Sequence, residues 1–523
     1  MISNLFRLFG LIAIVAVNVC EGSRILAIFP APETSHQIVF RALIKGLLDR
    51  GHHVTMMTPM PFETDNPNIT QINWSYTKKI AEETGDVAVM RQEDCSSLTT
   101  VFKMLEVARK LIETELSHPE VQELIRNASE EQFDVLIVEY YQMTPFHAFA
   151  ELFNVPLIGI TSVDSVPIAH EGVGNENNLV THPDFNHKST TDLNFLQRLK
   201  FVSIGIFLNL VIKPLEFAKY DKMIEKHFGS NMTKSKDLMY RIDLLMTNTE
   251  PALGYIRPIV PQAIQLGFLH IEPPKPLPSD LQQFMDKSQH GVIYFSLGTL
   301  IRCSSIYPQN LKIFIDTFKA LKYDVLWKCD SKLNLNGTSN IRVVQWVPQQ
   351  DLLAHPNVKL FVTQGGQQSM EEAVDRHVPM VVIPFNFDQF GNADKVVERG
   401  IGQKIWMEHL TTDGLREAIL EVIGNKKYKR NIERLGKLVR DQPMRPVEKA
   451  VWWTEYVIRH QGASHYRYKA AQMPAWQYHY YDVMATLLVA ALTVLAAVVY
   501  SVRWLFSYCF GQWYAVQAKE KTL

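Results

Sequence analysis

The sequence predicts an α/β protein of two facing doubly wound, Rossmann-like domains, followed by a single transmembrane helix. With 523 residues, the chain is too long for one hydrophobic core. Short buried-strand runs alternate with helical stretches in both halves. Near the C-terminus, Val483–Val502 contains no charge and is long enough to cross a hydrocarbon layer of ~30 Å.

The composition is that of a globular protein, with 47% hydrophobic residues and 53 basic against 54 acidic side chains. A protein that reads nucleic acid would normally carry a basic excess, so no nucleic-acid partner is expected. No internal repeat of 20–50 residues is evident.

The N-terminus has the layout of a secretory signal peptide, assigned to residues 1–22. Arg7 precedes the apolar run Leu8–Val17, and small or polar residues follow around Cys20–Gly22. An uncleaved membrane anchor is the alternative, but the run is short for a span of ~20 residues. The chain is therefore expected to enter the secretory pathway.

A first α/β domain is predicted over residues 23–270. It begins with a strand, Ile25–Phe29, then a helix that Gly51 ends, then a second strand, Val54–Thr58. Further buried-strand runs follow at Val135–Val138, Pro156–Ile160 and Leu244–Thr247.

One uncharged stretch in this domain, Phe201–Ile212, is too short to span a membrane. It is expected to belong to the core or to line an apolar acceptor pocket, with contact to a membrane surface as the alternative.

Prolines mark a linker over residues 271–281, because four of them fall within six residues and cannot continue a helix or a central strand. They are Pro273, Pro274, Pro276 and Pro278. A second α/β domain with returning helices is predicted over residues 282–462. Its strand runs are Val292–Leu297, Val325–Trp327, Val358–Val362 and Met380–Ile383, and its helical stretches include Gln309–Leu321 and Asn392–Arg399.

The C-terminal part is predicted to comprise a juxtamembrane segment (463–482), a transmembrane helix (483–502) and a cytosolic tail (503–523). Aromatic residues precede the span, and Arg503, Lys519 and Lys521 follow it, as in a type I protein. The two lysines near the end resemble a retrieval signal of endoplasmic reticulum membrane proteins, although a charged tail end is the plain alternative. Five glycosylation sequons would then be luminal: Asn68, Asn73, Asn127, Asn231 and Asn336.

Cysteine usage is sparse. Cys95, Cys303 and Cys329 are the cysteines of the predicted luminal part, so at most one internal disulfide is expected there, and whether Cys303 pairs with Cys329 stays open. No Cys/His cluster has zinc-ligand spacing, and no metal site is expected.

The stretch from Trp346 to Gln389 has the pattern of a nucleotide site. Gly365–Gly366 follows a strand and opens a helix, so a diphosphate can approach the backbone at the positive end of that helix. Trp346 can stack on a base, and Glu372 can accept hydrogen bonds from a ribose diol. Asp388 and Gln389 follow the next strand, where their side chains can hold sugar hydroxyls.

These residues resemble the signature of the UDP-glycosyltransferase family, most closely its animal, insect-like microsomal branch. The resemblance implies two domains of the GT-B type and a UDP-sugar donor as co-substrate, without a cofactor. It places Trp346 on uracil, Gln349 beside the base, Glu372 on the ribose, and Asp388 and Gln389 on the donor sugar. The diphosphate would be surrounded by Ser296, Gly298, Thr299, Gln364, Gly365, Gly366, Gln368 and Ser369.

Two positions depart from the family pattern. Gln364 stands where many relatives have histidine, and an amide still donates a hydrogen bond to phosphate but adds no charge. Phe387 stands where many have a small residue, which leaves the donor sugar in doubt. Glucose is preferred over glucuronic acid.

His36 matches the family's general base, at the start of the first helix and the carboxyl edge of the sheet. Glu139, at the end of a later strand, matches its carboxylate partner, although relatives often have aspartate there. Asp134 and Asp164 are fallback partners.

The expected reaction is inverting, metal-independent transfer of a hexose to a hydroxyl of a small lipophilic acceptor, as in detoxification. The chain has no Asp-x-Asp motif for a metal-bound diphosphate. A sugar-nucleotide oxidoreductase would need a glycine fingerprint where Pro30–Glu33 stands. A non-catalytic relative that binds lipophiles is the other alternative. Acceptor identity and a possible homo-oligomer stay open.

Overall fold

The structure is a computed structural model of the chain. It describes residues 22–83, 97–141, 143–164, 167–176, 178, 180, 193–254, 256–299, 301–331, 333, 335 and 337–520. The signal peptide (but for its last residue), the sequon at Asn336 and the last three residues therefore lie outside the described part. The chain forms two compact units, Met1–Arg467 and Tyr468–Leu523.

The first unit contains a seven-stranded sheet in the order β3-β2-β1-β4-β5-β6-β7, in which every pairing is parallel. Its strands are β1 (Arg24–Ile28), β2 (His53–Thr58), β3 (Ile69–Asn73), β4 (Val135–Glu139), β5 (Leu157–Thr161), β6 (Leu244–Thr247) and β7 (Ala263–Gln265). The five predicted strands of this half are confirmed to within a residue or two, while β3 and β7 were not predicted.

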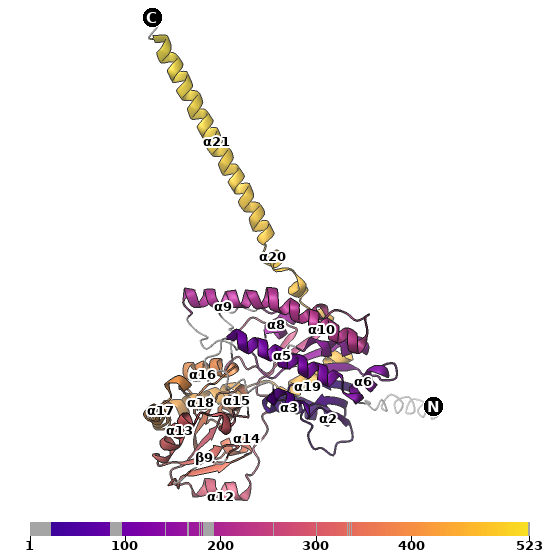
Figure 1. Ribbon diagram of the computed structural model, residues 1–523, viewed down its shortest axis with the longest axis vertical. Coiled ribbons are helices and arrows are strands. Elements are labelled where there is room, and N and C mark those ends of the chain that lie inside the picture. Colours follow the sequence, from indigo (N-terminus) through magenta and orange to yellow (C-terminus); the bar gives the residue numbers. More distant parts are fainter. Residues whose placement is uncertain are drawn as a thin grey trace, which may run out of the picture. The chain divides into compact units, whose positions relative to one another are not determined.

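Alternate residues of the central strands enter two different cores, because successive side chains point to opposite faces of a sheet. Leu26 and Ile28 pack on one face, and Ile25 and Ala27 on the other. The helices of this half are α2 (Thr34–Asp49), α3 (Thr77–Glu83), α5 (Ser97–Leu116), α6 (Pro119–Arg126), α7 (Ala148–Leu152), α8 (Pro167–Val173), α9 (Phe195–Phe207), α10 (Lys213–Phe228) and α11 (Ser235–Leu238) (Figure 1).

The prediction that Phe201–Ile212 belongs to the core or to a pocket is wrong. These residues lie in α9 and in the π-helical segment η2 (Leu208–Ile212), and Gly205 is the one fully buried residue among them. The apolar side chains of this stretch are exposed or half-buried.

The first unit also contains a six-stranded parallel sheet in the order β10-β9-β8-β11-β12-β13. Its strands are β8 (Val292–Ser296), β9 (Asp324–Lys328), β10 (Ile341–Val344), β11 (Val358–Thr363), β12 (Met380–Val382) and β13 (Gly402–Lys404). Helices cover both faces: α12 (Ser279–Lys287), α13 (Pro308–Lys319), α14 (Gln349–Leu353), α15 (Gln367–Asp375), α16 (Asp388–Glu398), α17 (Thr412–Gly424) and α18 (Lys426–Arg440).

The last helix of the unit, α19 (Pro446–Arg459), returns to the first sheet and packs against α2. Ala450 and Val451 join the core on that face, and Gly46 of α2 leaves room for Val447, whose Cγ1 would lie 2.6 Å from an added Cβ. Chain segments of both halves thus build the first domain.

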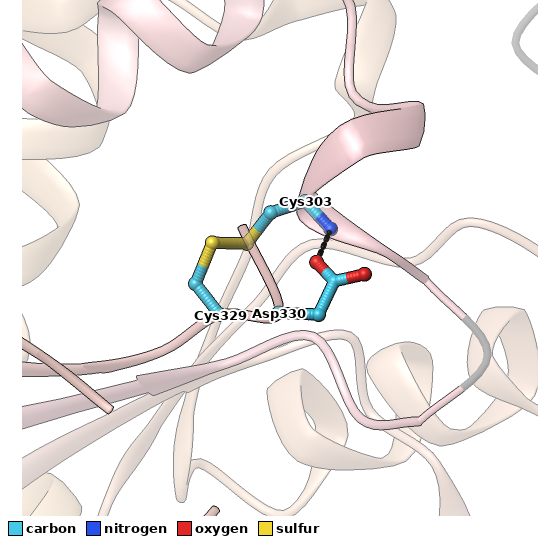
Figure 2. Close-up of side chains that lie close together, drawn as sticks. All are labelled: Cys303, Cys329 and Asp330. Atoms are coloured by element: carbon cyan, nitrogen blue, oxygen red, sulfur yellow. Dashed lines mark hydrogen bonds between the residues drawn. A yellow bond between two sulfur atoms is a disulfide. The ribbon is translucent and has the colours of Figure 1, made fainter. Parts of the chain in front are cut away.

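A disulfide joins Cys303, in the loop after β8, to Cys329, directly after β9 (Figure 2). Asp330 accepts a hydrogen bond from the Cys303 backbone N–H at 2.9 Å. The bridge therefore links two neighbouring loops at the carboxyl edge of the second sheet.

The second unit is dominated by one helix, α21 (Tyr481–Glu520), with a mean hydropathy of 2.5 and no buried residues in its most apolar window. Length and composition make it a candidate membrane span. The helix continues past Val502, so the end of the span within it stays a prediction.

We expect the variant Cys303→Ala/Cys329→Ala to unfold at a lower temperature than the wild type, since a bridge of this separation, 26 residues, stabilises by roughly 3 kcal/mol. Differential scanning calorimetry without reductant measures the difference. With reductant, the wild type should fall to the temperature of the variant, and a reductant-insensitive wild type would contradict the bridge.

Candidate active site

A cavity of about 800 Å³ lies between the carboxyl edges of the two sheets, and both halves of the first unit line it. This is where ligands bind in open α/β sheets, because loops and helix N-termini gather at that edge. Its volume lies within the range of small-molecule and cofactor sites.

His36 lies in the first turn of α2 and faces Glu139, the last residue of β4. Their Nδ1 and Oε1 atoms are 2.6 Å apart, and the His36 side chain is 19% exposed while that of Glu139 is 2% exposed. The other Glu139 oxygen accepts the Ala31 backbone N–H at 3.0 Å. The glutamate therefore reaches the ring in spite of its extra methylene.

The charge state of His36 depends on its carboxylate neighbours. Burial lowers the pKa of the imidazole, but the hydrogen bond that the ring donates to Glu139 and the charges of Glu139, Glu33 and Asp388 outweigh burial and raise that pKa to about 9. Burial in turn raises the pKa of Glu33 and of Asp388. The site thus favours an imidazolium ion.

Beside His36, the cavity wall is largely apolar. It includes Ile38 and Ala42 of α2, and four residues on one side of α5: Met104, Val107, Ala108 and Leu111. Such a surface fits a lipophilic molecule placed against the imidazole.

On the opposite wall, Gln349 and Glu372 form a bonded pair. Gln349 donates to the Glu372 carboxylate at 2.6 Å and to Ser369 at 3.0 Å, and accepts from the Tyr294 hydroxyl at 2.9 Å. His270 lies 3.3 Å from the second oxygen of Glu372. The polar groups expected at the base and ribose are therefore held in one cluster.

Trp346 stands at the rim of this cluster with 64% of its surface exposed. The ammonium of Lys328 lies 4.4 Å from the centre of the indole ring and donates to the Gly298 carbonyl at 3.3 Å. The indole thus presents a free surface to the cavity beside a positive charge.

Two glycines bring the backbone close to the expected diphosphate. Gly298 has φ +76°, and a Cβ there would lie 2.1 Å from the Gln364 amide nitrogen; Gly365 has φ +85°, and a Cβ there would lie 2.5 Å from Val382. Any other residue at either position would be strained and would collide. Both turns therefore require glycine.

Asp388 and Gln389 lie in the first turn of α16. Asp388 accepts the backbone N–H of Gln367, the first residue of α15, at 2.9 Å and the Asn392 amide at 2.8 Å. Gln389 accepts from the backbone N–H of Phe385 at 2.9 Å. Phe387, between strand and helix, has φ +52°, a strained value for a residue with a side chain.

The cavity gathers most of the predicted binding residues. Its lining includes His36, Gly298, Thr299, Trp346, Gln349, Gln364, Gly366, Gln368, Ser369, Glu372, Asp388 and Gln389. Glu139 and Ser296 lie behind the lining and contact His36 and Gly298, which do line it. Gly365 also lies outside the lining, and its carbonyl accepts a hydrogen bond from Asn392.

Neither fallback partner contacts His36. Asp134 stands at the opposite edge of the sheet, where it accepts the Arg24 backbone N–H at 2.7 Å. Asp164 is buried beside His170 and Arg257; burial raises its pKa, but the hydrogen bond from His170 and the charge of Arg257 outweigh burial and lower it.

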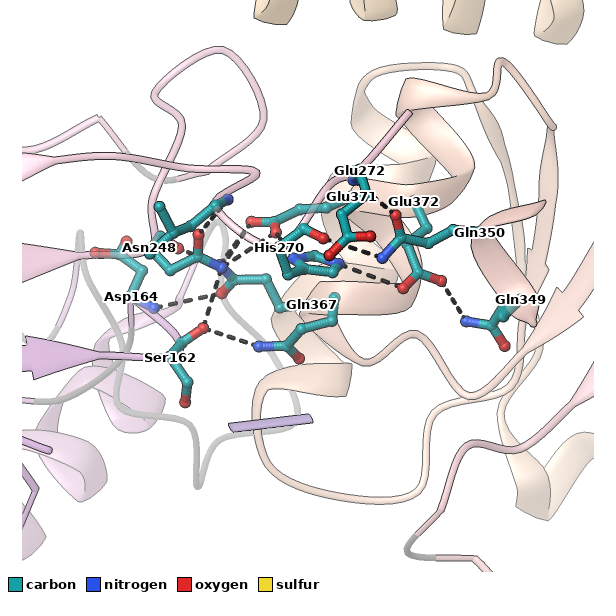
Figure 3. A network of polar contacts seen from close by, with 12 residues as sticks. Ser162, Asp164, Asn248, His270, Glu272, Gln349, Gln350, Gln367, Glu371 and Glu372 are labelled. Carbon is teal, nitrogen blue, oxygen red and sulfur yellow. Dashed lines mark hydrogen bonds and ion pairs between the residues drawn. The ribbon is translucent and has the colours of Figure 1, made fainter. Parts of the chain in front are cut away.

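A buried polar network joins the two halves beside the cavity (Figure 3). Asn248, which follows β6, donates to both oxygens of Glu371 in α15, at 3.3 and 3.1 Å. Gln367 bonds to the backbone of Asn248 and Asp164, and Gln368 donates to the Ser162 carbonyl at 2.9 Å. The first turns of α15 are thus fixed to the first sheet.

Sequence reasoning missed Lys328, Asn248, His270 and Glu371. Lys328 ends β9 and Asn248 directly follows β6, so the rule that site residues gather at the carboxyl ends of parallel strands could have found both. No local pattern marks His270, because its partners come from a helix about a hundred residues away along the chain.

Among the described residues, one group has the spacing of a metal site: Cys303, Cys329 and Asp330. The two sulfurs are bonded to each other, so this group is a disulfide with a neighbouring carboxylate.

Known proteins resemble the chain over nearly its whole length. Residues 24–516 match the family described as UDP-glucoronosyl and UDP-glucosyl transferase. UDP-glucosyltransferase 2 of Dactylopius coccus is 33% identical over 91% of this chain and 92% of its own. Ecdysteroid UDP-glucosyltransferase of Spodoptera littoralis nuclear polyhedrosis virus is 32% identical over 92% of this chain and 97% of its own.

Among solved structures, the glycotransferase of kitacinnamycin has a TM-score of 0.57 at 18% identity, covering 84% of this chain and 99% of its own, which supports the fold alone. With its two parallel sheets and the cavity between their carboxyl edges, the chain belongs to the UDP-glucoronosyl and UDP-glucosyl transferase family and is a UDP-glycosyltransferase of the GT-B fold.

Proposed function

We propose that the protein transfers a hexose, preferably glucose, from its UDP-sugar to a hydroxyl of a small lipophilic acceptor, with inversion and without a metal ion. The observation that carries the proposal is the His36–Glu139 pair at 2.6 Å, which faces an apolar wall on its own side and the Gln349–Glu372 cluster across one cavity.

The acceptor binds against α2 and α5 with its hydroxyl toward the imidazole. Neutral His36 takes the hydroxyl proton on Nε2 while its Nδ1–H donates to Glu139, so positive charge forms next to a buried carboxylate. The acceptor oxygen attacks the anomeric carbon as the bond to the diphosphate oxygen breaks, which inverts the configuration.

The leaving UDP takes up the negative charge. We assign three features to the diphosphate of UDP: the glycine turns at Gly298 and Gly365, the start of α15, and the ammonium of Lys328. Trp346 stacks on uracil, Glu372 holds the ribose, and Asp388 and Gln389 hold the sugar. Asp388 has one oxygen occupied by α15, so we assign the sugar contact to the other.

Two features support glucose and a lipophilic acceptor. Two of the most similar relatives are named as glucosyltransferases, one of them acting on ecdysteroids. The acceptor wall carries four apolar side chains on α5 alone. Glucuronic acid as the donor sugar remains the second candidate.

We further propose a type I topology in the endoplasmic reticulum membrane with both domains in the lumen. The disulfide between Cys303 and Cys329 fits an oxidising compartment. Of the four sequons that the structure describes, Asn73, Asn127 and Asn231 are exposed and Asn68 is half-buried, so all four are candidate glycosylation sites.

We expect His36→Ala to lower turnover by about 10²–10⁴-fold, since a positioned general base contributes that much, while UDP affinity stays nearly unchanged. Glu139→Gln should slow turnover too, and the double variant should be little worse than His36→Ala alone, because the two residues act as a unit. UDP release with an aliphatic alcohol measures turnover, and His53→Ala, an exposed histidine on β2, is the matched control.

The pH profile separates the roles of the pair. Only neutral His36 accepts a proton, so kcat/KM for the acceptor should rise with pH toward a pKa raised from 6.5 to about 9. In Glu139→Gln the lost charge should move this limb about one unit or more to lower pH. If this limb lay at the same pH in the wild type and in Glu139→Gln, Glu139 would not be the residue that raises the pKa of the base.

We expect Trp346→Ala to raise the KM for the donor about tenfold or more, because base stacking on an aromatic side chain contributes ~1–3 kcal/mol. Because the indole is exposed, its removal should not destabilise the fold, so a higher KM would reflect weaker donor binding. Trp346→Phe keeps a stacking surface and should keep most of the affinity. Equal donor KM values in the wild type and in folded Trp346→Ala would place uracil elsewhere.

Protease treatment of intact microsomes should shorten the protein only slightly, because only the segment after the span would be accessible. Endoglycosidase should lower the mass of the protected band. Complete digestion in intact vesicles would overturn the luminal topology.

A further inference from the structure

The disulfide between Cys303 and Cys329 lies directly behind the wall of the cavity. Both cysteines are buried, at 7% and 3% exposed, and neither lines the cavity. The residues directly before them, Arg302 and Lys328, do line it. Gly298, at the other end of the loop that leads from β8 to Cys303, lines it as well. The bridge therefore joins two segments that each supply part of the cavity wall.

Three contacts join these two segments at the carboxyl edge of the second sheet. The pairing of β8 with β9 ends at Ser296 and Lys328. Beyond it, the Lys328 ammonium donates to the Gly298 carbonyl at 3.3 Å. The Asp330 carboxylate accepts the Cys303 backbone N–H at 2.9 Å (Figure 2). The disulfide is the covalent contact of the three, so it limits most strongly how far the segments can separate.

Lys328 and the turn at Gly298 are intrinsically flexible. A lysine carries its charge at the end of a flexible stem, and Gly298, with φ +76°, has no side chain that would restrict the turn. The ammonium also lies 4.4 Å from the centre of the Trp346 ring. A ligand that must order a mobile lysine and a mobile turn binds more weakly than one that meets them already in place.

We propose that the Cys303–Cys329 disulfide is a positioning group of the donor site, which holds Lys328 against the turn at Gly298 in the arrangement that receives the diphosphate of UDP. The inference rests on the proposed function, which assigns both groups to the diphosphate. It adds that the affinity for UDP and its sugars depends on the oxidation state of two cysteines that do not contact the donor themselves.

The segment between the two cysteines does not rely on the bridge for its position. It contains α13 and β9, and Phe314, Phe318 and Trp327 of these elements are buried against Phe295 of β8. Packing of this kind already fixes the helix and the strand in the folded protein. The bridge therefore acts on the folded protein mainly at its own two ends, and both ends adjoin residues that line the cavity.

The test compares UDP binding by the full chain in detergent with and without the bridge. Cys303→Ser/Cys329→Ser removes the bridge permanently. Dithiothreitol removes it from the wild type: two electrons and two protons pass to the cysteines, which become thiols, while dithiothreitol becomes a cyclic disulfide. Calorimetric titration measures the UDP dissociation constant. We expect this constant and the KM for UDP-glucose to rise about three- to tenfold in both cases, as expected when one or two side chains must be ordered on binding.

Turnover at saturating donor and the KM for the acceptor should each change by less than about twofold. Saturating donor orders Lys328 in any case, and His36 and the acceptor wall on α5 belong to the other half of the unit. The double variant should not respond to dithiothreitol, which excludes an effect of other cysteines. Circular dichroism at the assay temperature checks its fold, and the reduced wild type answers the same question independently.

A further variant asks whether the bridge acts through Lys328. Lys328→Met keeps the length of the side chain but removes its charge, so there is no ammonium left to position. Reduction should then weaken UDP binding clearly less than in the wild type, because the effects of coupled groups do not add. Lys359→Met, which changes an exposed lysine of β11, is the matched control and should leave the effect of reduction at its wild-type size.

Equal UDP dissociation constants in the oxidised wild type, the reduced wild type and the folded double variant would overturn the proposal and leave the bridge a role in stability alone. A full effect of reduction in Lys328→Met would overturn it as well, because the bridge would then not act through the lysine. Lack of glucose transfer in every form would contradict the proposed function alone, because titration with UDP requires neither acceptor nor turnover.

Discussion

The hydrogen bonds between Asn248 and the first turns of α15 fix the geometry on which the site depends. They are buried, so each unpaired amide or carboxylate would be costly, and the pairing holds the carboxyl edges of two separate sheets against each other. Through Glu371, Glu372 and His270 the same network reaches Gln349. The groups expected to bind the nucleoside are therefore positioned by contacts with the opposite domain. Burial raises the pKa of Glu371 to about 7.

The strands that could be predicted from the sequence are those that are buried on both sides. All nine predicted strands lie inside the sheets, and the four that were missed, β3, β7, β10 and β13, are the outer strands of the two sheets. An outer strand has one neighbour and a partly solvated surface, so Thr70 and Gln71 of β3 are tolerated and the apolar run that marks a strand is lost. The polarity of β3 is thus a consequence of its position.

The residues that line the candidate site were predictable where one short segment supplies them, and not where distant segments meet. The turn from Gln364 to Glu372 places its residues by local geometry, so spacing alone indicated a diphosphate site. Lys328 and His270 act through partners elsewhere in the chain, and only the fold brings them to the cavity. The prediction that Phe201–Ile212 is buried was wrong for a related reason. An apolar run predicts contact with an apolar surface, but the sequence of one segment does not say whether that surface belongs to the same protein.

The proton chemistry of His36 depends on a balance between burial and charge. Burial is the largest single effect and lowers the pKa of the imidazole. Together, Glu139, Glu33 and Asp388 raise the pKa by more than burial lowers it. With a pKa of about 9, most His36 side chains are protonated at pH 7, and the neutral form is a strong base. In the proposed reaction, an apolar acceptor against α5 would displace water from the exposed part of the His36 ring and so add to the effect of burial, which lowers the pKa of the imidazole. The nearby carboxylates would then stabilise the imidazolium once the proton had been transferred.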